Sequence, residues 1–179
     1  MNQDKYWLDI CNSIASNSKC LSRKLGAVIV KNDRFIVSTG YNGPPSKCLH
    51  CDNEAYRKYL FDLMLKDKLF DYLPSDIDNK RCPRQAAGFI PRASSGIEYC
   101  QASHAERNAI AIAAKLGHST DGCSMYMNGP TPCFECAKSV INAGIKEIIV
   151  TKLEDYEKIG ITGRRLLEQA GVKIRKYNL

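Results

Sequence analysis

The fold is decided by residues 123–151, which read CSMYMNGPTPCFECAKSVINAGIKEIIVT. The segment opens on an apolar run that predicts a β-strand, and Thr131-Pro132 is typical of a helix start. Gly144 ends that helix, and residues 145–151 form a second β-branched run. A strand, a helix and a strand in this order predict two parallel strands joined by a right-handed crossover.

The same criteria, applied outward from this segment, predict the rest of the chain. They give three more helices, over residues 4–17, 103–116 and 162–170. They also give three more strands, over residues 25–30, 35–39 and 172–177, of which the first two form a hairpin. Strands that alternate with helices indicate an α/β fold, here a three-layer α/β/α sandwich around one mixed five-stranded sheet.

Residues 44–99 interrupt this alternation of strands and helices. They contain scattered proline, cysteine and charged residues around one helix predicted near residues 54–70. The segment is too short for a convincing core of its own. We therefore interpret residues 1–179 as a single domain with an insertion at about residues 44–99. The chain has no apolar run long enough to span a bilayer. Residues 1–7 lack the pattern of an export signal, so we expect a cytoplasmic protein.

The composition contains 44% hydrophobic and 25% charged residues, the balance of a soluble globular protein. A formal net charge of +7 suits an anionic partner such as a nucleotide or a nucleic acid, although solubility alone explains it equally well. Nine cysteines are many for this length. In a reducing cytosol they favour metal binding or catalysis over disulfides.

The strongest functional signal combines H-x-E at His104 and Glu106 with P-C-x-x-C at Cys133 and Cys136. Both pieces lie at predicted helix starts, the first with Ser103 as the expected N-cap. Taken singly, each has an ordinary explanation: a capping box in the first case, a structural half-site or a redox pair in the second. Together they match the signature of zinc deaminases. One imidazole and two thiolates leave a fourth position on zinc open for water, as in catalytic sites.

The chemistry of such a site explains why these residue types are needed. Zinc lowers the pKa of a bound water toward neutrality. Glu106 is expected to be the catalytic residue, which takes a proton from the water, delivers it to ring nitrogen N3 and later protonates the departing ammonia.

Longer segments around these motifs resemble the deoxycytidylate deaminases of the cytidine deaminase superfamily, in particular their phage and bacterial branch. The matching segments are residues 26–30, 40–45, 104–110, 122–126, 132–138 and 143–147. The resemblance implies the cytidine deaminase fold and the zinc-dependent hydrolysis of deoxycytidine monophosphate (dCMP) to dUMP and ammonia. Residues 53–97 match nothing in that family.

The resemblance also implies substrate-binding residues. Asn42 and Asn108 correspond to residues that hold the sugar and phosphate, and Tyr156 to an aromatic that stacks on the base. Ordinary alternatives exist, because Asn42-Gly43 is also a turn signal. Asn108 is also a plausible solvated helix residue, and Tyr156 a plausible loop tyrosine.

Regulation is implied in the same way. Many members of the family are homohexamers that deoxycytidine triphosphate (dCTP) activates and thymidine triphosphate (dTTP) with Mg²⁺ inhibits. The corresponding effector segment here is Tyr41, Asn42 and Gly43. We therefore expect these two effectors, Mg²⁺ as their companion ion and a homohexamer.

A second, structural zinc is implied by the remaining cysteines. Cys20, Cys51 and Cys100 correspond to ligands of an extra zinc site in the phage and bacterial branch. Cys48 is our preferred fourth ligand, with His50 and Cys82 as alternatives. The branch can place a histidine two residues before the catalytic one, whereas this chain has Ala102 there. Unligated thiols in a reducing cell remain the simpler alternative.

Three other functions compete with dCMP deamination. A deaminase of a base within RNA or DNA needs a basic groove with aromatic residues, but the basic residues here are spread along the chain. A deaminase of dCTP fits the same motifs. A zinc-stabilised binding module has no use for Glu106 beside an open position. We therefore expect no stable nucleic-acid partner and no membrane partner.

Overall fold

The computed structural model describes residues 2–69, 81–89, 96–155, 157 and 160–178. The helices are α1 (Gln3–Ala15), α2 (Glu54–Lys66), α3 (Pro83–Ala86), a 3₁₀ helix η1 (Ile97–Tyr99), α4 (Ala105–Lys115), α5 (Phe134–Asn142) and α6 (Gly163–Gln169). The strands are β1 (Gly26–Lys31), β2 (Phe35–Tyr41), β3 (Ser124–Pro130), β4 (Glu147–Lys152) and β5 (Lys173–Lys176). Every helix and strand predicted above is present, with ends that differ by a few residues.

The chain divides into two compact units. The first, here called the sheet unit, comprises Met1–Ser18, Leu25–Asn42 and His104–Leu179. The second, here called the insertion unit, comprises Lys19–Lys24 and Gly43–Ser103. The predicted insertion at residues 44–99 falls inside the second unit, which also takes in the short segment before β1. Whether the whole chain acts as one domain stays a prediction.

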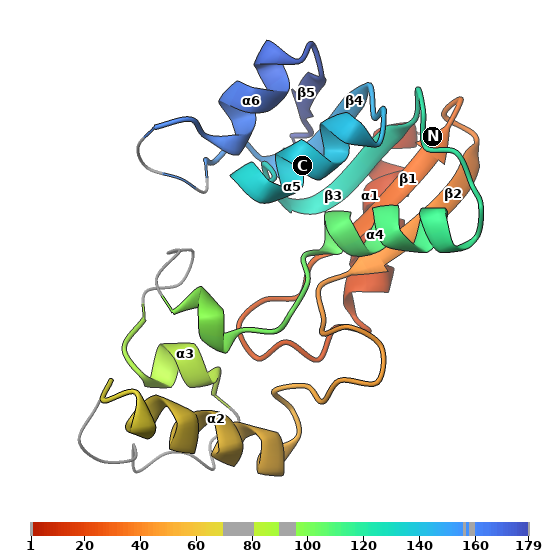
Figure 1. The fold of residues 1–179 in the computed structure, drawn as a ribbon. Helices are drawn as coiled ribbons and strands as arrows, with labels where there is room; N and C mark the ends of the chain where they lie inside the picture. The colour runs from red at the N-terminus through yellow and green to blue at the C-terminus, as the bar shows by residue number, and fades with distance from the viewer. Residues whose placement is uncertain (1, 70–80, 90–95, 156, 158–159, 179) are drawn as a thin grey trace. The chain divides into compact units, whose positions relative to one another are not determined.

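The sheet unit contains one five-stranded sheet with the strand order β2-β1-β3-β4-β5 (Figure 1). β1 runs antiparallel to both β2 and β3, while β3 with β4 and β4 with β5 are parallel pairs. The hairpin, the mixed sheet and the parallel later strands are therefore confirmed. The parallel pair β3 and β4 is joined through α5, as the crossover rule requires.

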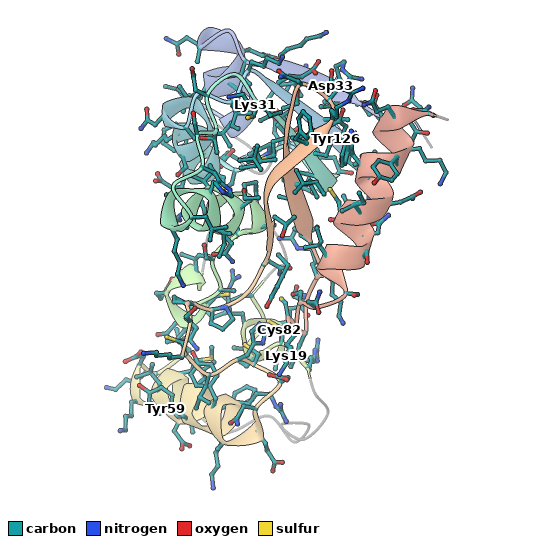
Figure 2. All side chains as sticks on the ribbon, turned by 90° about the vertical axis from the view of Figure 1, so that its right-hand side faces the viewer. Lys19, Lys31, Asp33, Tyr59, Cys82 and Tyr126 are labelled. Carbon is teal, nitrogen blue, oxygen red and sulfur yellow. The ribbon has the colours of Figure 1, made fainter. Side chains whose placement is uncertain are left out.

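Helices cover both faces of this sheet, because successive side chains of a strand point to opposite sides. Ala27, Ile29 and Met125 belong to a buried cluster that includes residues of α4, α5 and α6. Their strand neighbours Val28, Val30 and Tyr126 pack instead with Trp7, Leu8 and Cys11 of α1. Figure 2 labels Tyr126, whose hydroxyl donates to Asp4 on α1 at 3.1 Å. The predicted three-layer sandwich is thus confirmed.

The insertion unit contains α2, α3 and η1, and its other described residues form mainly turns and irregular segments. Its apolar core in the described residues centres on α2, where Leu60, Phe61 and Met64 are buried. Arg57, on the same helix, is also buried, and its guanidinium donates to the carbonyl oxygens of Cys51 and Asp52. Across the described part of the chain, no helix combines the length and apolar character needed to cross a membrane.

Candidate metal centre and active site

Two of the predicted ligands occupy N-cap positions. α4 begins at Ala105, with His104 as its N-cap in extended backbone geometry at φ −73° and ψ 156°. α5 begins at Phe134, with Cys133 as its N-cap at φ −67° and ψ 167°. The expectation that Ser103 is the N-cap of α4 was wrong by one residue. His104 has extended backbone geometry, so it is the N-cap and α4 begins at Ala105. Neither N-cap side chain caps its own helix.

The side chains of these N-caps meet at a third ligand from the first turn of α5. His104 Nδ1 lies 3.4 Å from Cys133 Sγ and 3.3 Å from Cys136 Sγ. All three ligand atoms lie within 4.8 Å of one another. A tetrahedral zinc with ordinary zinc–nitrogen and zinc–sulfur bonds sets its nitrogen and sulfur ligands about 3.5 Å apart. The donor set and its spacing therefore fit zinc.

The protonation of the two thiols is coupled. The hydrogen bond from Cys136 lowers the pKa of Cys133 to about 4, and His104 acts in the same direction. The same hydrogen bond raises the pKa of its donor, Cys136. Because thiolate is the metal-binding form of cysteine, the site already favours one charged sulfur ligand.

Glu106 lies in the first turn of α4, two residues after His104, and is 4% exposed. Burial raises the pKa of its carboxyl, and the nearby His104 opposes that shift. Its side chain also hydrogen-bonds with Cys136. A buried carboxyl beside the ligands suits a group that accepts a proton and then returns it.

The end of β2 packs closely against the start of α4. A Cβ atom on Gly40 would lie 2.4 Å from both the Ala105 carbonyl oxygen and the Ala109 nitrogen, so only glycine fits there. Asn108 Nδ2 donates to the Tyr41 carbonyl oxygen at 2.7 Å. None of the sequence motifs indicated this role of Gly40, although a glycine inside a strand is a known sign of close backbone approach.

Asn42 follows β2 and is 7% exposed. Its side-chain oxygen accepts the Leu25 N–H at 2.8 Å, and its own N–H donates to the Leu25 carbonyl at 3.0 Å. The Ser18 hydroxyl donates to the Asn42 carbonyl at 2.7 Å. Asn42 therefore fixes the backbone of Leu25, the residue directly before β1, a structural role that the turn signal and the family resemblance did not reveal.

The other residues expected to bind a nucleotide differ in their surroundings. Tyr41 is 42% exposed at the end of β2. Gly43 exchanges two backbone hydrogen bonds with Ser103, at 3.1 and 2.8 Å, within the insertion unit. Tyr156 lies outside the described residues.

Four cysteines of the insertion unit are electrostatic neighbours. The pKa of Cys51 is raised to about 12, mainly by burial and in addition by the charges of Cys100, Cys82 and Cys20. Cys82 and Cys20 act on Cys100 in the same direction, and Figure 2 labels Cys82. Outside the His104 site, the described residues contain no other group of three or more ligand atoms within 4.8 Å. The four thiols thus form a looser cluster.

The two other candidates for the second site are placed differently. Cys48 is exposed. His50 is largely buried, and neither of its ring nitrogens has a hydrogen-bond partner among the described groups. The Asp52 carboxylate lies 3.8 Å from His50 Nδ1, beyond hydrogen-bonding distance. Burial lowers the pKa of His50, so its neutral, metal-binding form is favoured.

Comparison with known proteins agrees with this geometry. Residues 1–152 match the family model for the cytidine and deoxycytidylate deaminase zinc-binding region. The chain belongs to this family. The match contains all three ligands of the candidate metal centre as well as Glu106, so family membership and site geometry identify a zinc-dependent deaminase.

Relatives and solved structures extend the comparison over nearly the whole chain. The chain is 35% identical over 170 residues to deoxycytidylate deaminase of Enterobacteria phage T2, covering 93% of this chain and 88% of that protein. It is 33% identical to the human deoxycytidylate deaminase over 178 residues, 97% of this chain and 78% of that protein. The crystal structure of dCMP deaminase from cyanophage S-TIM5 shares the fold, with a TM-score of 0.62 at 22% identity over 97% of this chain and 96% of that one.

Proposed function

We propose that this chain catalyses the hydrolytic deamination of dCMP to dUMP and ammonia. The observation that carries the proposal is the convergence of His104, Cys133 and Cys136 within 4.8 Å, with the buried Glu106 two residues after the histidine. Relatives that are named deoxycytidylate deaminases and align over most of the chain favour dCMP as the substrate.

The residues of the site divide the chemistry between them. Zinc held by the two thiolates and the imidazole would supply a water molecule whose pKa lies near neutrality. Glu106 accepts a proton from that water and passes it to N3 of the cytosine ring, which makes C4 more electrophilic. The water oxygen bonds to C4, and Glu106, which has lost its first proton to N3, takes a second proton from the new C4 hydroxyl. Glu106 gives this second proton to the amino nitrogen; the C4–N bond then breaks as C4=O forms, so that one water is consumed and one ammonia departs.

Asn42, Asn108 and Tyr156 are our proposed substrate-binding residues. The hydrogen bond from Asn108 to the carbonyl of Tyr41 supports this, because it joins the first turns of α4 to the backbone next to Asn42. The proposal for Tyr156 rests on the family resemblance alone. A substrate hydroxyl at Asn42 would have to share the side-chain oxygen that the Leu25 N–H already uses.

Allosteric control is a second part of the proposal. We propose that dCTP and Mg²⁺-bound dTTP act at Tyr41, Asn42 and Gly43 of a homohexamer in the cytoplasm. The exposure of Tyr41 at 42% and the net charge of +7 support binding of a polyanion. Rate curves against dCMP concentration should be sigmoidal, inhibited by dTTP with Mg²⁺ and relieved by dCTP. Hyperbolic curves that neither triphosphate changes, from a monomer in solution, would contradict this part.

The insertion unit is the proposed site of a second zinc. The mutual electrostatic influence of Cys20, Cys51, Cys82 and Cys100 supports these four as the ligands. In that choice Cys82 replaces the exposed Cys48 preferred from the sequence, and His50, whose ring nitrogens are buried, is the alternative. Binding would draw the looser thiols to the spacing of a closed tetrahedral site.

Ammonia release from dCMP, dCTP, cytidine and an adenosine-containing RNA hairpin tests the main proposal. The purified zinc-loaded chain should release ammonia fastest from dCMP at equal concentrations. Preference for dCTP would move the substrate to the triphosphate. Activity on the hairpin alone would assign the site to a base within a nucleic acid.

A further inference from the structure

One carboxylate connects the starts of two helices next to the metal centre. Glu157 Oε1 accepts the N–H of Phe134, the first residue of α5, at 2.5 Å. Its other oxygen, Oε2, accepts the N–H of Gly163, the first residue of α6, at 3.0 Å. Phe134 directly follows Cys133, so the carboxylate forms a hydrogen bond with the backbone immediately next to a proposed metal ligand.

The helix that carries two ligands needs this contact. The first N–H groups of a helix have no partner within the helix, and the N-cap side chain usually supplies one. At the start of α5 the N-cap is Cys133, whose side chain makes no cap hydrogen bond and approaches His104 Nδ1 at 3.4 Å instead. The N–H of Phe134, the first residue of the helix, is not one that an N-cap side chain usually bonds, and its acceptor comes from a distant residue. Glu157 supplies it, and its negative charge also suits the positive end of the helix dipole.

The start of α6 also packs against the backbone of Pro132 and Cys133. A Cβ atom on Gly163 would lie 2.1 Å from the Pro132 carbonyl oxygen and 2.7 Å from the Cys133 carbonyl carbon. α6 can therefore reach this loop only because residue 163 is glycine. The carboxylate and the close packing together leave the backbone of Cys133 little room to shift.

We propose that Glu157 is a positioning residue for the metal centre. By tying α5 to α6 it fixes the direction of the Cys133 side chain, and through it the site at which Glu106 acts. The inference rests on the proposed function for its link to catalysis, but its effect on metal binding is independent of the substrate. Groups that orient metal ligands typically contribute about 10- to 100-fold to metal affinity or activity.

The test compares Glu157→Gln and Glu157→Ala with wild type and with the control Glu168→Gln. Gln keeps one acceptor oxygen and can satisfy only one of the two N–H groups, whereas Ala satisfies neither. Glu168 is an exposed carboxylate on α6 that pairs with Arg164 at 2.9 Å. The readouts are zinc release to a chelator well below the melting temperature and the thiolate-to-metal absorption of the Co²⁺-substituted protein. The catalytic ion is identified as the one that Cys133→Ser loses.

We expect release of this ion to become about tenfold faster in Glu157→Gln and faster still in Glu157→Ala. The Co²⁺ spectrum should shift in the same order, kcat should fall with KM for dCMP nearly unchanged, and Glu168→Gln should match wild type. Unchanged zinc release and an unchanged Co²⁺ spectrum in folded Glu157→Gln would overturn the inference. If Glu157→Ala does not fold, Glu157→Gln alone decides it. If the wild type fails to deaminate dCMP while the zinc effects persist, the proposed substrate fails and the positioning role stands.

Discussion

The sheet unit and the insertion unit hold their candidate metal ligands in different ways. In the sheet unit, His104 and Cys133 are N-caps of helices that pack on a five-stranded sheet. Their ligand atoms and that of Cys136 already lie within 4.8 Å. In the insertion unit, the thiols of Cys51 and its neighbours influence one another's pKa values without reaching that spacing.

This difference indicates that a metal ion has a different role in each unit. A sheet with helices on both faces buries enough apolar surface to fold first and then bind zinc at prepared positions. The insertion unit has a small core around α2, of the size that commonly depends on a metal or a disulfide. All nine cysteines of the chain are free thiols, so a metal is the available means. We therefore expect zinc to supply chemistry in one unit and folding energy in the other.

The largest effect should come from Glu106→Gln, which tests whether the sheet unit separates chemistry from folding. The amide keeps the shape of the side chain but cannot carry the proton, so kcat should fall by about 100- to 10,000-fold. Zinc content and melting temperature should stay close to wild type. Steady-state kinetics and plasma emission spectrometry measure both. Glu135→Gln, at an exposed carboxylate on α5 that pairs with Lys138, is the control. More than about a tenth of wild-type activity in Glu106→Gln would remove the role given to this residue.

Loss of the second zinc should unfold the insertion unit and leave the sheet unit intact. Wild type should contain two zinc ions, and Cys51→Ser and Cys100→Ser should each lower the content by about one ion. Hydrogen exchange should then become fast for the amides of α2 and stay slow for those of β3. A wild-type zinc content near one ion per chain would rule out the second site. It would also contradict the proposal that zinc stabilises the insertion unit.

The identity of the fourth ligand of the second zinc can be tested with single substitutions. Cys82→Ser should cost one zinc ion, whereas Cys48→Ser, at an exposed thiol, should cost none. The zinc content of the two variants and of His50→Ala separates the candidates. Zinc loss in Cys48→Ser with full occupancy in Cys82→Ser would restore the ligand set preferred from the sequence.

Gly40→Ala tests the packing that prepares the catalytic site in the sheet unit. The added methyl group would meet backbone atoms of Ala105 and Ala109 at 2.4 Å, so α4 must move away from β2. Such overpacking typically costs about 1–3 kcal/mol of stability, and kcat should fall as well. Gly129→Ala is a matched control, because its methyl group meets the flexible Leu25 side chain at 2.9 Å. Equal changes in the melting temperature of the two variants would contradict this account.

The smallest effect should come from Asp4→Asn, on α1 of the sheet unit. Hydrogen bonds from Arg175, at 2.6 and 3.1 Å, hold the pKa of Asp4 below its usual value, and Tyr126 adds to this. Glu147 accepts from the same guanidinium at 2.8 Å and pairs with Lys173 at 3.3 Å. Because the folded-state pKa is lowered, the carboxylate stabilises the fold above about pH 4, and this stability is lost as the pH falls further.

Melting curves from pH 7 down to pH 3 measure this effect. Asp4→Asn should lower the stability by about 1 kcal/mol at pH 7, and its difference from wild type should shrink on acidification. Asp9→Asn, which removes the exposed ion pair with Lys5, should change little at any pH. A difference for Asp4→Asn that grows as the pH falls would show that the sign of the linkage is reversed.

Local signals in the sequence determined the architecture and the chemistry of this protein. The ligands His104, Cys133 and Cys136 and the proton carrier Glu106 lie in two short motifs, and their spacing needs only a helix start to become a site. The alternation of strands and helices fixed the mixed sheet, because right-handed crossovers leave few topologies. Helix starts were less certain, and the shift from Ser103 to His104 shows that the backbone geometry at an N-cap is not readable from residue types alone.

Contacts between distant segments were decided only by the tertiary structure. Glu157 has no motif around it, and its role follows from the meeting of α5 and α6 at one carboxylate. The same holds for Asn42, which bonds the backbone of Leu25, and for Cys82, whose charge reaches Cys51. Residue types and spacing encode which chemistry is possible because catalytic groups sit close together in short motifs. Which distant backbone groups support those motifs depends on the packing of the whole core, and no local pattern records it.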